Sequence, residues 1–169
     1  KWDRVLDDSD APFYKWYAGG KTNLSYNCLD RHLDSATRNK AALIWEGEPG
    51  DRRVLTYGDM AREVSIFANA LKKLGIKKGD RVAMMAPNTL AFAIGMFGVI
   101  RTGAIQVNVN PLYSPRELKH QLSDGDADTI IIFSGSTPTL AEIIDGTPVR
   151  NVIVFGLDDL IGKGLPSPP

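Results

Sequence analysis

The stretch that decides the fold is RVAMMAPNTLAFAIGMFGVIRTGAIQVNVNP, residues 81–111. It begins with a short apolar pattern, residues 81–86, which predicts a strand that Pro87 stops. The apolar run over residues 89–101 is shorter than the roughly 20 residues of a membrane span, so it predicts a buried helix. Residues 104–108 then predict a second strand. A strand, a helix and a strand in this order indicate a right-handed crossover between parallel strands.

The same alternation of strands and helices continues on both sides of this unit. A helix is predicted from Thr56 to Gly75, with Asp59 placed as in a capping box. A second capped helix is predicted over residues 115–122, because Ser114 and Glu117 have the capping-box spacing. The remaining patterns predict a short helix at 139–144 and strands at 41–45, 129–133 and 151–155. The predicted fold class is α/β, with a mainly parallel sheet and flanking helices.

The chain divides into three predicted parts. Residues 1–40 show no sustained period and are predicted to be an irregular, aromatic-rich arm that lies over another surface; the aromatic residues are Trp2, Phe13, Tyr14, Trp16, Tyr17 and Tyr26. Residues 41–157 form the predicted α/β subdomain. Residues 158–169 have no core-forming pattern and are predicted to be a linker or a cut end.

The composition is that of an ordinary globular protein, with 43% apolar and 24% charged residues. Twenty basic residues balance twenty acidic ones, so we expect no nucleic-acid partner. The apolar runs are too short for a membrane span, so we also expect no integral membrane segment. The single cysteine, Cys28, excludes an intrachain disulfide and is typical of a reducing compartment, which makes the predicted location cytoplasmic.

No group of residues in the sequence predicts catalysis or metal binding. His32 and His120 have no partner residue at a spacing typical of a catalytic or metal site, and Cys28 has no local basic motif. We therefore expect His120 at the surface and Cys28 packed. Asp124-Gly-Asp-Ala-Asp128 imitates the start of a calcium loop but lacks its later glycine and glutamate, and we interpret it as a polar turn. Dinucleotide and Walker-type glycine motifs do not occur. From the residues we therefore assign no catalytic, cofactor-binding or metal site.

Two motifs resemble a known enzyme family. Leu55-Thr-Tyr-Gly-Asp-Met60 and Val99-Ile-Arg-Thr-Gly-Ala-Ile-Gln-Val-Asn-Val-Asn-Pro111 are similar to the first two core motifs of the adenylate-forming superfamily, which includes acyl-CoA synthetases, luciferases and peptide-synthetase adenylation domains. Residues 1–86 most resemble acetyl-CoA or propionyl-CoA synthetases, and residues 99–155 most resemble long-chain fatty-acid-CoA ligases. Both likenesses in one chain fit an intermediate family member, a natural recombinant or an assembled sequence.

The resemblance implies a partial N-terminal domain of an acyl-CoA synthetase. The parent would activate a carboxylic or fatty acid with ATP and Mg²⁺ and pass the acyl group to CoA, and the chain's main partner would be the remainder of the parent polypeptide. The family's Pro-Lys-Gly phosphate loop and Tyr-Gly-x-Thr-Glu segment are absent from this sequence, so the chain alone is predicted to be inactive. The alternatives are a free-standing, non-catalytic α/β binding or interaction module, and another adenylating enzyme such as a luciferase.

The segment FSGSTPTL, residues 133–140, resembles the start of the family's phosphate loop, and its strand-to-helix setting suits an anion. Pro138 stands where the family has a glycine, and the segment has no arginine at the place where acetate-type enzymes contact CoA. We therefore interpret it as a helix start. In this interpretation Ser136 or Thr137 caps a short helix, which buries Leu140, Ile143 and Ile144.

Overall fold

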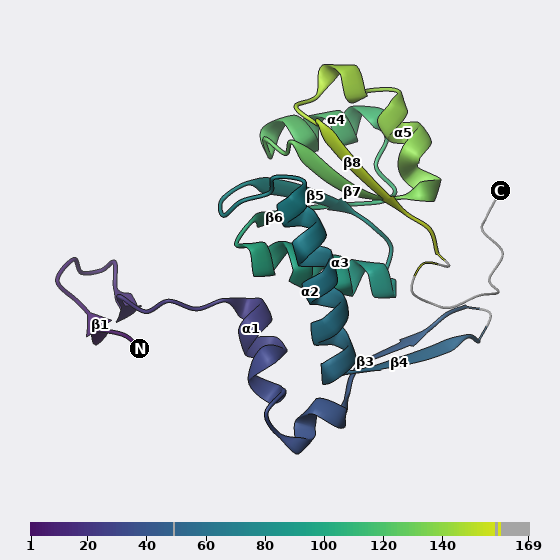
Figure 1. Ribbon diagram of the computed structural model, residues 1–169. Helices are drawn as coiled ribbons and strands as arrows, with labels where there is room; N and C mark the ends of the chain where they lie inside the picture. Colours follow the sequence, from purple (N-terminus) through teal and green to yellow (C-terminus); the bar gives the residue numbers. More distant parts are fainter. Residues whose placement is uncertain (49, 158, 160–169) are drawn as a thin grey trace.

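A four-stranded parallel sheet lies at the centre of the structure, a computed structural model that describes residues 1–48, 50–157 and 159. Its strands are β5 (Arg81–Met85), β6 (Ile105–Val109), β7 (Thr129–Phe133) and β8 (Asn151–Phe155), in the order β6-β5-β7-β8 (Figure 1). The register is continuous, so that Met84 lies between Asn108 and Ile131. The predicted α/β class with a mainly parallel sheet is confirmed.

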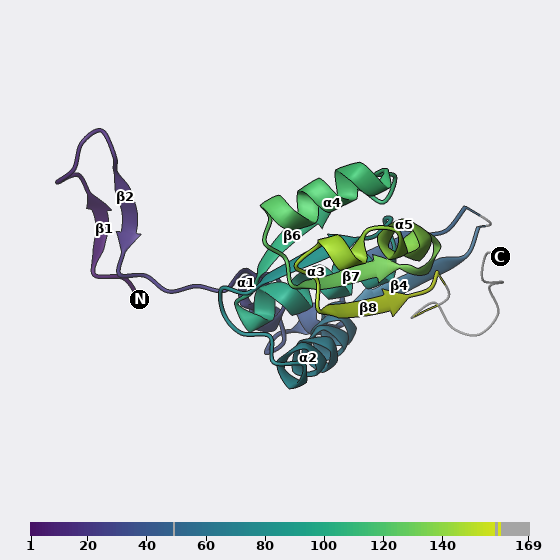
Figure 2. The same cartoon turned by 90° about the horizontal axis from the view of Figure 1, so that it is seen from above.

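Helices cover both faces of this sheet (Figures 1 and 2). On one face lie α2 (Tyr57–Lys73) and α3 (Leu90–Thr102), and on the other lie α4 (Pro115–Asp124) and α5 (Thr137–Ala141). The crossover predicted from residues 81–111 is the unit β5-α3-β6. Among the described residues, no helix is both long enough and apolar enough to cross a membrane.

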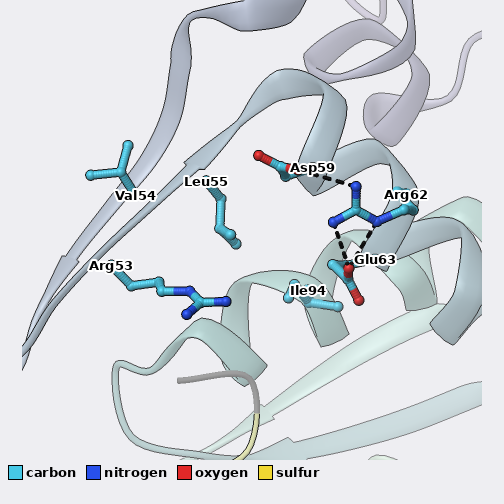
Figure 3. Close-up of a pocket in the computed structure, with 7 residues that line it drawn as sticks. All are labelled: Arg53, Val54, Leu55, Asp59, Arg62, Glu63 and Ile94. Carbon is cyan, nitrogen blue, oxygen red and sulfur yellow. Dashed lines mark hydrogen bonds and ion pairs between the residues drawn. The ribbon is translucent and has the colours of Figure 1, made fainter. Parts of the chain in front are cut away.

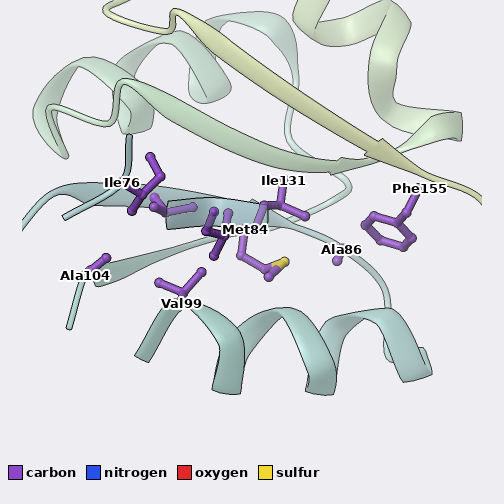
Figure 4. Packing of buried hydrophobic residues seen from close by; sticks show 9 residues of the cluster. Ile76, Met84, Ala86, Val99, Ala104, Ile131 and Phe155 are labelled. Carbon is purple, nitrogen blue, oxygen red and sulfur yellow. The ribbon is translucent and has the colours of Figure 1, made fainter. Parts of the chain in front are cut away.

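The two cores of the sheet follow from the alternation of side chains along β5. Val82 and Met84 point to the α2 and α3 face, where they pack with Val99 and the other residues of the cluster in Figure 4. Ala83 and Met85 point to the opposite face and pack with the helix residues Leu118, Leu122 and Leu140. Because both faces of β5 are covered, its apolar residues form one continuous run rather than an alternating pattern.

Two glycines let α3 approach its neighbours closely. A Cβ at Gly95 would come within 2.5 Å of Met84 Cε, and one at Gly98 would come within 2.7 Å of Phe67 Cδ1. The helix thus packs between β5 on one side and α2 on the other. The two glycines allow this close packing, which explains why glycine occurs inside an apolar helix.

Both predicted capping boxes are present. The Thr56 hydroxyl accepts from the Asp59 amide at 3.1 Å, and the Asp59 carboxylate accepts from the Thr56 amide at 3.1 Å. Ser114 and Glu117 make the same pair of bonds at the start of α4, with proline at its first position. These bonds satisfy backbone amides that have no partner within the helix.

The N-terminal region differs from the predicted irregular arm. Antiparallel strands β1 (Arg4–Asp7) and β2 (Lys15–Ala18) form a hairpin that projects away from the rest of the chain instead of lying over it (Figures 1 and 2). The helix α1 (Leu24–Cys28) and a 3-10 turn (Asp30–His32) pack against α3 and α2, and a second 3-10 turn (Ala36–Asn39) follows. Four-residue strands and a five-residue helix are too short to give a readable sequence period.

A second antiparallel hairpin precedes α2, formed by β3 (Ala41–Glu46) and β4 (Arg52–Thr56). The sequence predicted β3, but it did not predict β4. β4 is a strand because it pairs with β3, with Ile44 beside Val54. The Trp45 indole also donates to the Asn88 carbonyl at 3.3 Å and ties this hairpin to the loop after β5.

The helix predicted at residues 139–144 begins earlier, at Thr137, and follows a 3-10 turn (Ser134–Ser136); another 3-10 turn (Ile144–Gly146) comes after it. The predicted cap is wrong. The Ser136 hydroxyl donates to the Pro111 carbonyl at 3.4 Å, and the Thr137 hydroxyl donates to the Ser134 carbonyl at 2.7 Å, so neither caps α5. Leu140 is buried as predicted. The predicted linker, residues 158–169, lies outside the described residues except for residue 159.

Candidate functional site

The carboxyl ends of β5 and β7 mark the place where this fold can form a ligand site. α3 leaves β5 toward one face of the sheet and α5 leaves β7 toward the other, although β5 and β7 are neighbours. Such a topological switch point opens a crevice between two loops. Here the loops are residues 86–89 after β5 and residues 134–136 after β7.

The polar side chains at this edge are engaged in tying loops together. Ser136, only 7% exposed, donates to the carbonyl of Pro111 and so joins the loops after β6 and β7. The Asn110 side-chain oxygen accepts from the Leu112 amide at 3.0 Å. Thr89 caps α3 by accepting from the Phe92 amide at 3.4 Å. These groups hold the loop backbones in place.

The glycine of the segment Phe133–Leu140 has a packing role. A Cβ at Gly135 would lie 2.5 Å from the Phe133 ring, which itself contacts the Phe155 ring at a centroid distance of 6.0 Å. The φ angle of Gly135 is not positive, so the residue is not required for a left-handed turn. The segment also has no lysine or arginine to balance a phosphate. Its geometry is that of a loop packed on the sheet. That the segment holds no nucleotide phosphate stays a prediction.

A hollow of about 450 Å³ lies where β4 meets α2 and α3, and Figure 3 shows the side chains around it. Arg62 is ion-paired with Asp59 at 3.1 Å and with Glu63 at 3.1 Å. The Thr56 hydroxyl and amide donate to Asp59, and this lowers the pKa of Asp59 below its usual value; the contact with Glu63 raises the pKa of Arg62. Both shifts hold the groups in their charged forms. A general acid would instead need a raised carboxyl pKa, which Asp59 does not have.

Cys28 and His32 line a second hollow of about 390 Å³, together with Tyr57 and Phe97. The His32 ring contacts the Tyr57 ring at a centroid distance of 4.9 Å, and Cys28 is half-buried. The lining is mainly apolar. That neither residue is catalytic stays a prediction.

His120 is exposed on α4, the surface position expected for it. Within the described residues, no group of three or more His, Cys, Asp or Glu side chains is placed to hold a metal ion. The Asp124–Asp128 turn instead provides Asp126, which pairs with Arg81 at 3.2 Å.

The polar cluster that sequence reasoning missed is centred on Arg101, near the end of α3. Its guanidinium forms an ion pair with Asp30 and donates to Ser65 at 2.6 Å and to Ser25 at 3.3 Å. These partners belong to three other segments, so Arg101 joins α1, the turn after it and α2 to α3. The sequence signal was a lone cation at the end of an apolar helix, but its partners lie 36 or more residues away.

Two protein-family models match the chain one after the other. The model "Acetyl-coenzyme A synthetase N-terminus" matches residues 1–28, and the model "AMP-binding enzyme" matches residues 29–163. The chain belongs to the AMP-binding enzyme family. The resemblance to adenylate-forming enzymes, with an acetyl-CoA-synthetase-like N-terminal region, is thereby confirmed.

The relatives and structural neighbours of this AMP-binding family member agree with the assignment. Acetyl-coenzyme A synthetase of Chlorobaculum tepidum is 43% identical over 165 residues, which are 92% of this chain and 25% of that protein. The Leptospira biflexa enzyme of the same name is 47% identical over 137 residues, or 80% of this chain and 21% of that protein. The chain thus spans a quarter or less of the length of these relatives.

Two solved structures share the fold. The long-chain-fatty-acid-CoA ligase FadD1 from Archaeoglobus fulgidus matches with a TM-score of 0.73 at 24% identity, over 80% of this chain and 28% of that one. The anthranilate CoA ligase AuaEII in complex with anthranoyl-AMP matches with a TM-score of 0.71 at 26% identity, over 92% of this chain and 28% of that one.

Proposed function

We propose that this chain supplies the N-terminal scaffold of an acyl-CoA synthetase of the acetyl-CoA synthetase type and is not catalytic by itself. The succession of an acetyl-CoA synthetase N-terminal model and an AMP-binding model along one chain carries this proposal. The relatives named acetyl-coenzyme A synthetase, at 43% and 47% identity, support a short carboxylic acid as the substrate of the parent protein.

The parent reaction would consume a carboxylate, ATP and CoA and would need Mg²⁺ at the phosphates. Stabilising a transferring phosphoryl group requires cations and hydrogen-bond donors that converge on it. At the described strand ends the Ser136 and Thr137 hydroxyls donate to loop carbonyls, and the segment Phe133–Leu140 has no lysine or arginine, which supports a phosphate site elsewhere. We therefore assign the phosphate and CoA contacts to the remainder of the parent polypeptide.

The scaffold role agrees with how polar groups are used in this chain. Arg101 joins separate segments, Arg62 neutralises two carboxylates of its own helix, and Ser136 ties two loops. Each of these contacts fixes backbone positions around the parallel sheet. A cytoplasmic location belongs to the same proposal, since the only cysteine of the chain is free.

Carboxylate-dependent ATP–pyrophosphate exchange tests the proposal in two arms. The 169-residue chain alone is expected to give no exchange with acetate. A chimera of the Chlorobaculum tepidum enzyme, with this chain replacing the aligned segment, is expected to retain acetate-dependent exchange. Exchange by the isolated chain would overturn the claim of inactivity. A folded chimera without exchange would contradict the scaffold role and favour the free-standing module.

A further inference from the structure

The hairpin of β1 and β2 exposes most of its large apolar side chains. Those that are between 50% and 73% exposed are Trp2, Val5, Phe13, Tyr14, Trp16 and Tyr17. Single exposed apolar residues are ordinary on a protein surface, but a contiguous group of them marks a place where another surface binds. Figures 1 and 2 show the hairpin projecting away from the rest of the described chain, which therefore leaves these side chains uncovered.

The hairpin is too small to be stable without a surface to pack on. Its two strands have four residues each, and the pairing joins Arg4 to Ala18 and Leu6 to Trp16. A two-stranded hairpin is at best marginally stable in water, and it becomes stable when further strands or a packed element cover one of its faces. Aromatic side chains contribute most to such packing, because each buries a large apolar area. The exposed rings of this hairpin are therefore the groups through which another surface would stabilise it.

Three of these rings surround a hollow of about 410 Å³ at the base of the hairpin. Its lining includes Trp2, Trp16 and Tyr17, together with Gly20 and Lys21. The Trp2 and Tyr17 rings contact each other edge to face, with their centroids 5.1 Å apart. Tryptophan and tyrosine are the residues that most often dominate the energy of an interface, particularly where they form a pocket. The hollow is thus shaped to receive an apolar side chain of an opposing surface.

The hairpin is anchored beside the amino ends of the sheet strands. Asn23 follows the hairpin, and its side-chain amide donates to the Ile100 carbonyl at 2.8 Å. The helix α3 runs from the carboxyl end of β5 back to the amino end of β6, so Ile100, in its last turn, lies near the amino ends of the strands. Figure 2 accordingly shows the hairpin on the side of the molecule away from the arrowhead of β8. The hairpin is therefore remote from the crevice at the carboxyl ends of β5 and β7.

We propose that the β1-β2 hairpin is a clamp that packs through Trp2, Trp16 and Tyr17 on the remainder of the parent polypeptide, beside the amino ends of the strands. This inference rests on the proposed scaffold function and names one contact by which the scaffold holds the parent together. The family model that matches residues 1–28 describes the N-terminus of acetyl-coenzyme A synthetases. This chain spans 25% of the Chlorobaculum tepidum enzyme, so most of such a protein is available to provide the opposing surface.

Amide hydrogen exchange of residues 1–20 tests this contact in two proteins, the isolated chain and the chimera with the Chlorobaculum tepidum enzyme. In the isolated chain these amides are expected to exchange at nearly the rate of an unprotected peptide, because the hairpin lacks a packing surface. In the chimera their exchange is expected to slow by about tenfold or more. Protection that is already complete in the isolated chain would overturn the proposal, because the hairpin would then need no remainder of the parent.

Two matched substitutions in the chimera test whether the contact is made at the hollow. Trp16→Ser removes part of the lining and is expected to return residues 1–20 to the fast exchange of the isolated chain. Val5→Ser is the control, because Val5 is an exposed apolar residue of the same hairpin that does not line the hollow, and it is expected to keep the protection. Equal loss of protection in both variants, or no loss in either, contradicts a contact at the hollow.

Acetate-dependent ATP–pyrophosphate exchange by the same chimeras separates this inference from the scaffold function. Because the hairpin is remote from the strand ends, Trp16→Ser should leave the KM for ATP and for acetate within about twofold of the unsubstituted chimera. A KM raised by about tenfold or more would contradict the position of the clamp. An active chimera with fast exchange at residues 1–20 overturns the clamp and leaves the scaffold function in place. A folded chimera with a protected hairpin and no pyrophosphate exchange supports the clamp and contradicts the scaffold function.

Discussion

Replacement of Arg101 by methionine should destabilise the chain far more than an equivalent change at an exposed ion pair. The Arg101 side chain is 21% exposed and that of its partner Asp30 is 26% exposed. Arg101→Met would remove the ion pair and leave Ser25, which is 0% exposed, without its charged donor. Hydrogen bonds to charged groups are each worth about 1.5–3 kcal/mol, and a buried group left without its partner costs a similar amount. Allowing for the water that reaches the pair, we expect a loss of about 3 kcal/mol.

Urea unfolding followed by circular dichroism measures this loss. With a slope of about 2 kcal/mol per molar urea, typical of small proteins, the midpoint should fall by about 1.5 M. Arg62→Met is the matched control, because Arg62 is also ion-paired on a helix but its side chain is 61% exposed. Exposed pairs are worth about 0–1 kcal/mol, so the control should move the midpoint by less than about 0.5 M.

A double-mutant cycle with Asp30→Asn separates the ion pair from general damage to α3. Because Arg101 and Asp30 are in contact, we expect a coupling energy of about 1–2 kcal/mol. Amide hydrogen exchange should also quicken in α1 and in the 3-10 turn of Asp30–His32 more than in the central sheet, since Arg101 holds those segments to α3. Equal losses for Arg101→Met and Arg62→Met, or a coupling energy near zero, would refute the reasoning.

Three further outcomes are expected. Gly98→Val should cost about 1–3 kcal/mol in urea unfolding, because the new side chain meets the Phe67 ring; a neutral result would mean that α2 and α3 can separate at no cost. Thr56→Ala should cost about 1 kcal/mol at neutral pH through the lost cap. Because Thr56 lowers the pKa of folded Asp59, the stabilisation from this contact is complete above the unfolded pKa of about 3.9 and is lost as pH falls through the folded pKa. The difference in unfolding free energy between the parent chain and Thr56→Ala should therefore narrow below about pH 4. A difference that stays constant with pH contradicts this. Magnesium ATP should cause no selective amide chemical-shift change at residues 133–140, and a saturable change there would contradict the assignment of phosphate contacts elsewhere.

The parts of the fold that the sequence predicted are those fixed by local or strongly periodic patterns. The unit over residues 81–111 was predictable because a strand buried on both faces reads as one apolar run. The caps of α2 and α4 were predictable because Thr56 and Ser114 find their partners three residues away. In these cases the information lies within one element and its immediate neighbours.

The parts that the sequence did not predict depend on distant partners. β4 is a strand only because β3 pairs with it, and the β1-β2 hairpin joins two strands of four residues each. Ser136 was expected to cap its own helix, but its hydroxyl reaches Pro111, 25 residues earlier. The sequence around Arg101 does not indicate its role, because Ser25, Asp30 and Ser65 become its neighbours only in the folded chain. That the chain alone is inactive remains a prediction, for which the exchange assay on the isolated chain is the test.

The polar groups at the carboxyl ends of β5 and β7 decide how readily a ligand could bind there. At the carboxyl ends of β5 and β7, hydroxyl and amide groups are bonded to neighbouring loop backbones, and a ligand would have to displace those bonds before it could be held. Breaking those bonds would leave groups such as the buried Ser136 hydroxyl without a partner, which costs about 1–3 kcal/mol for each group.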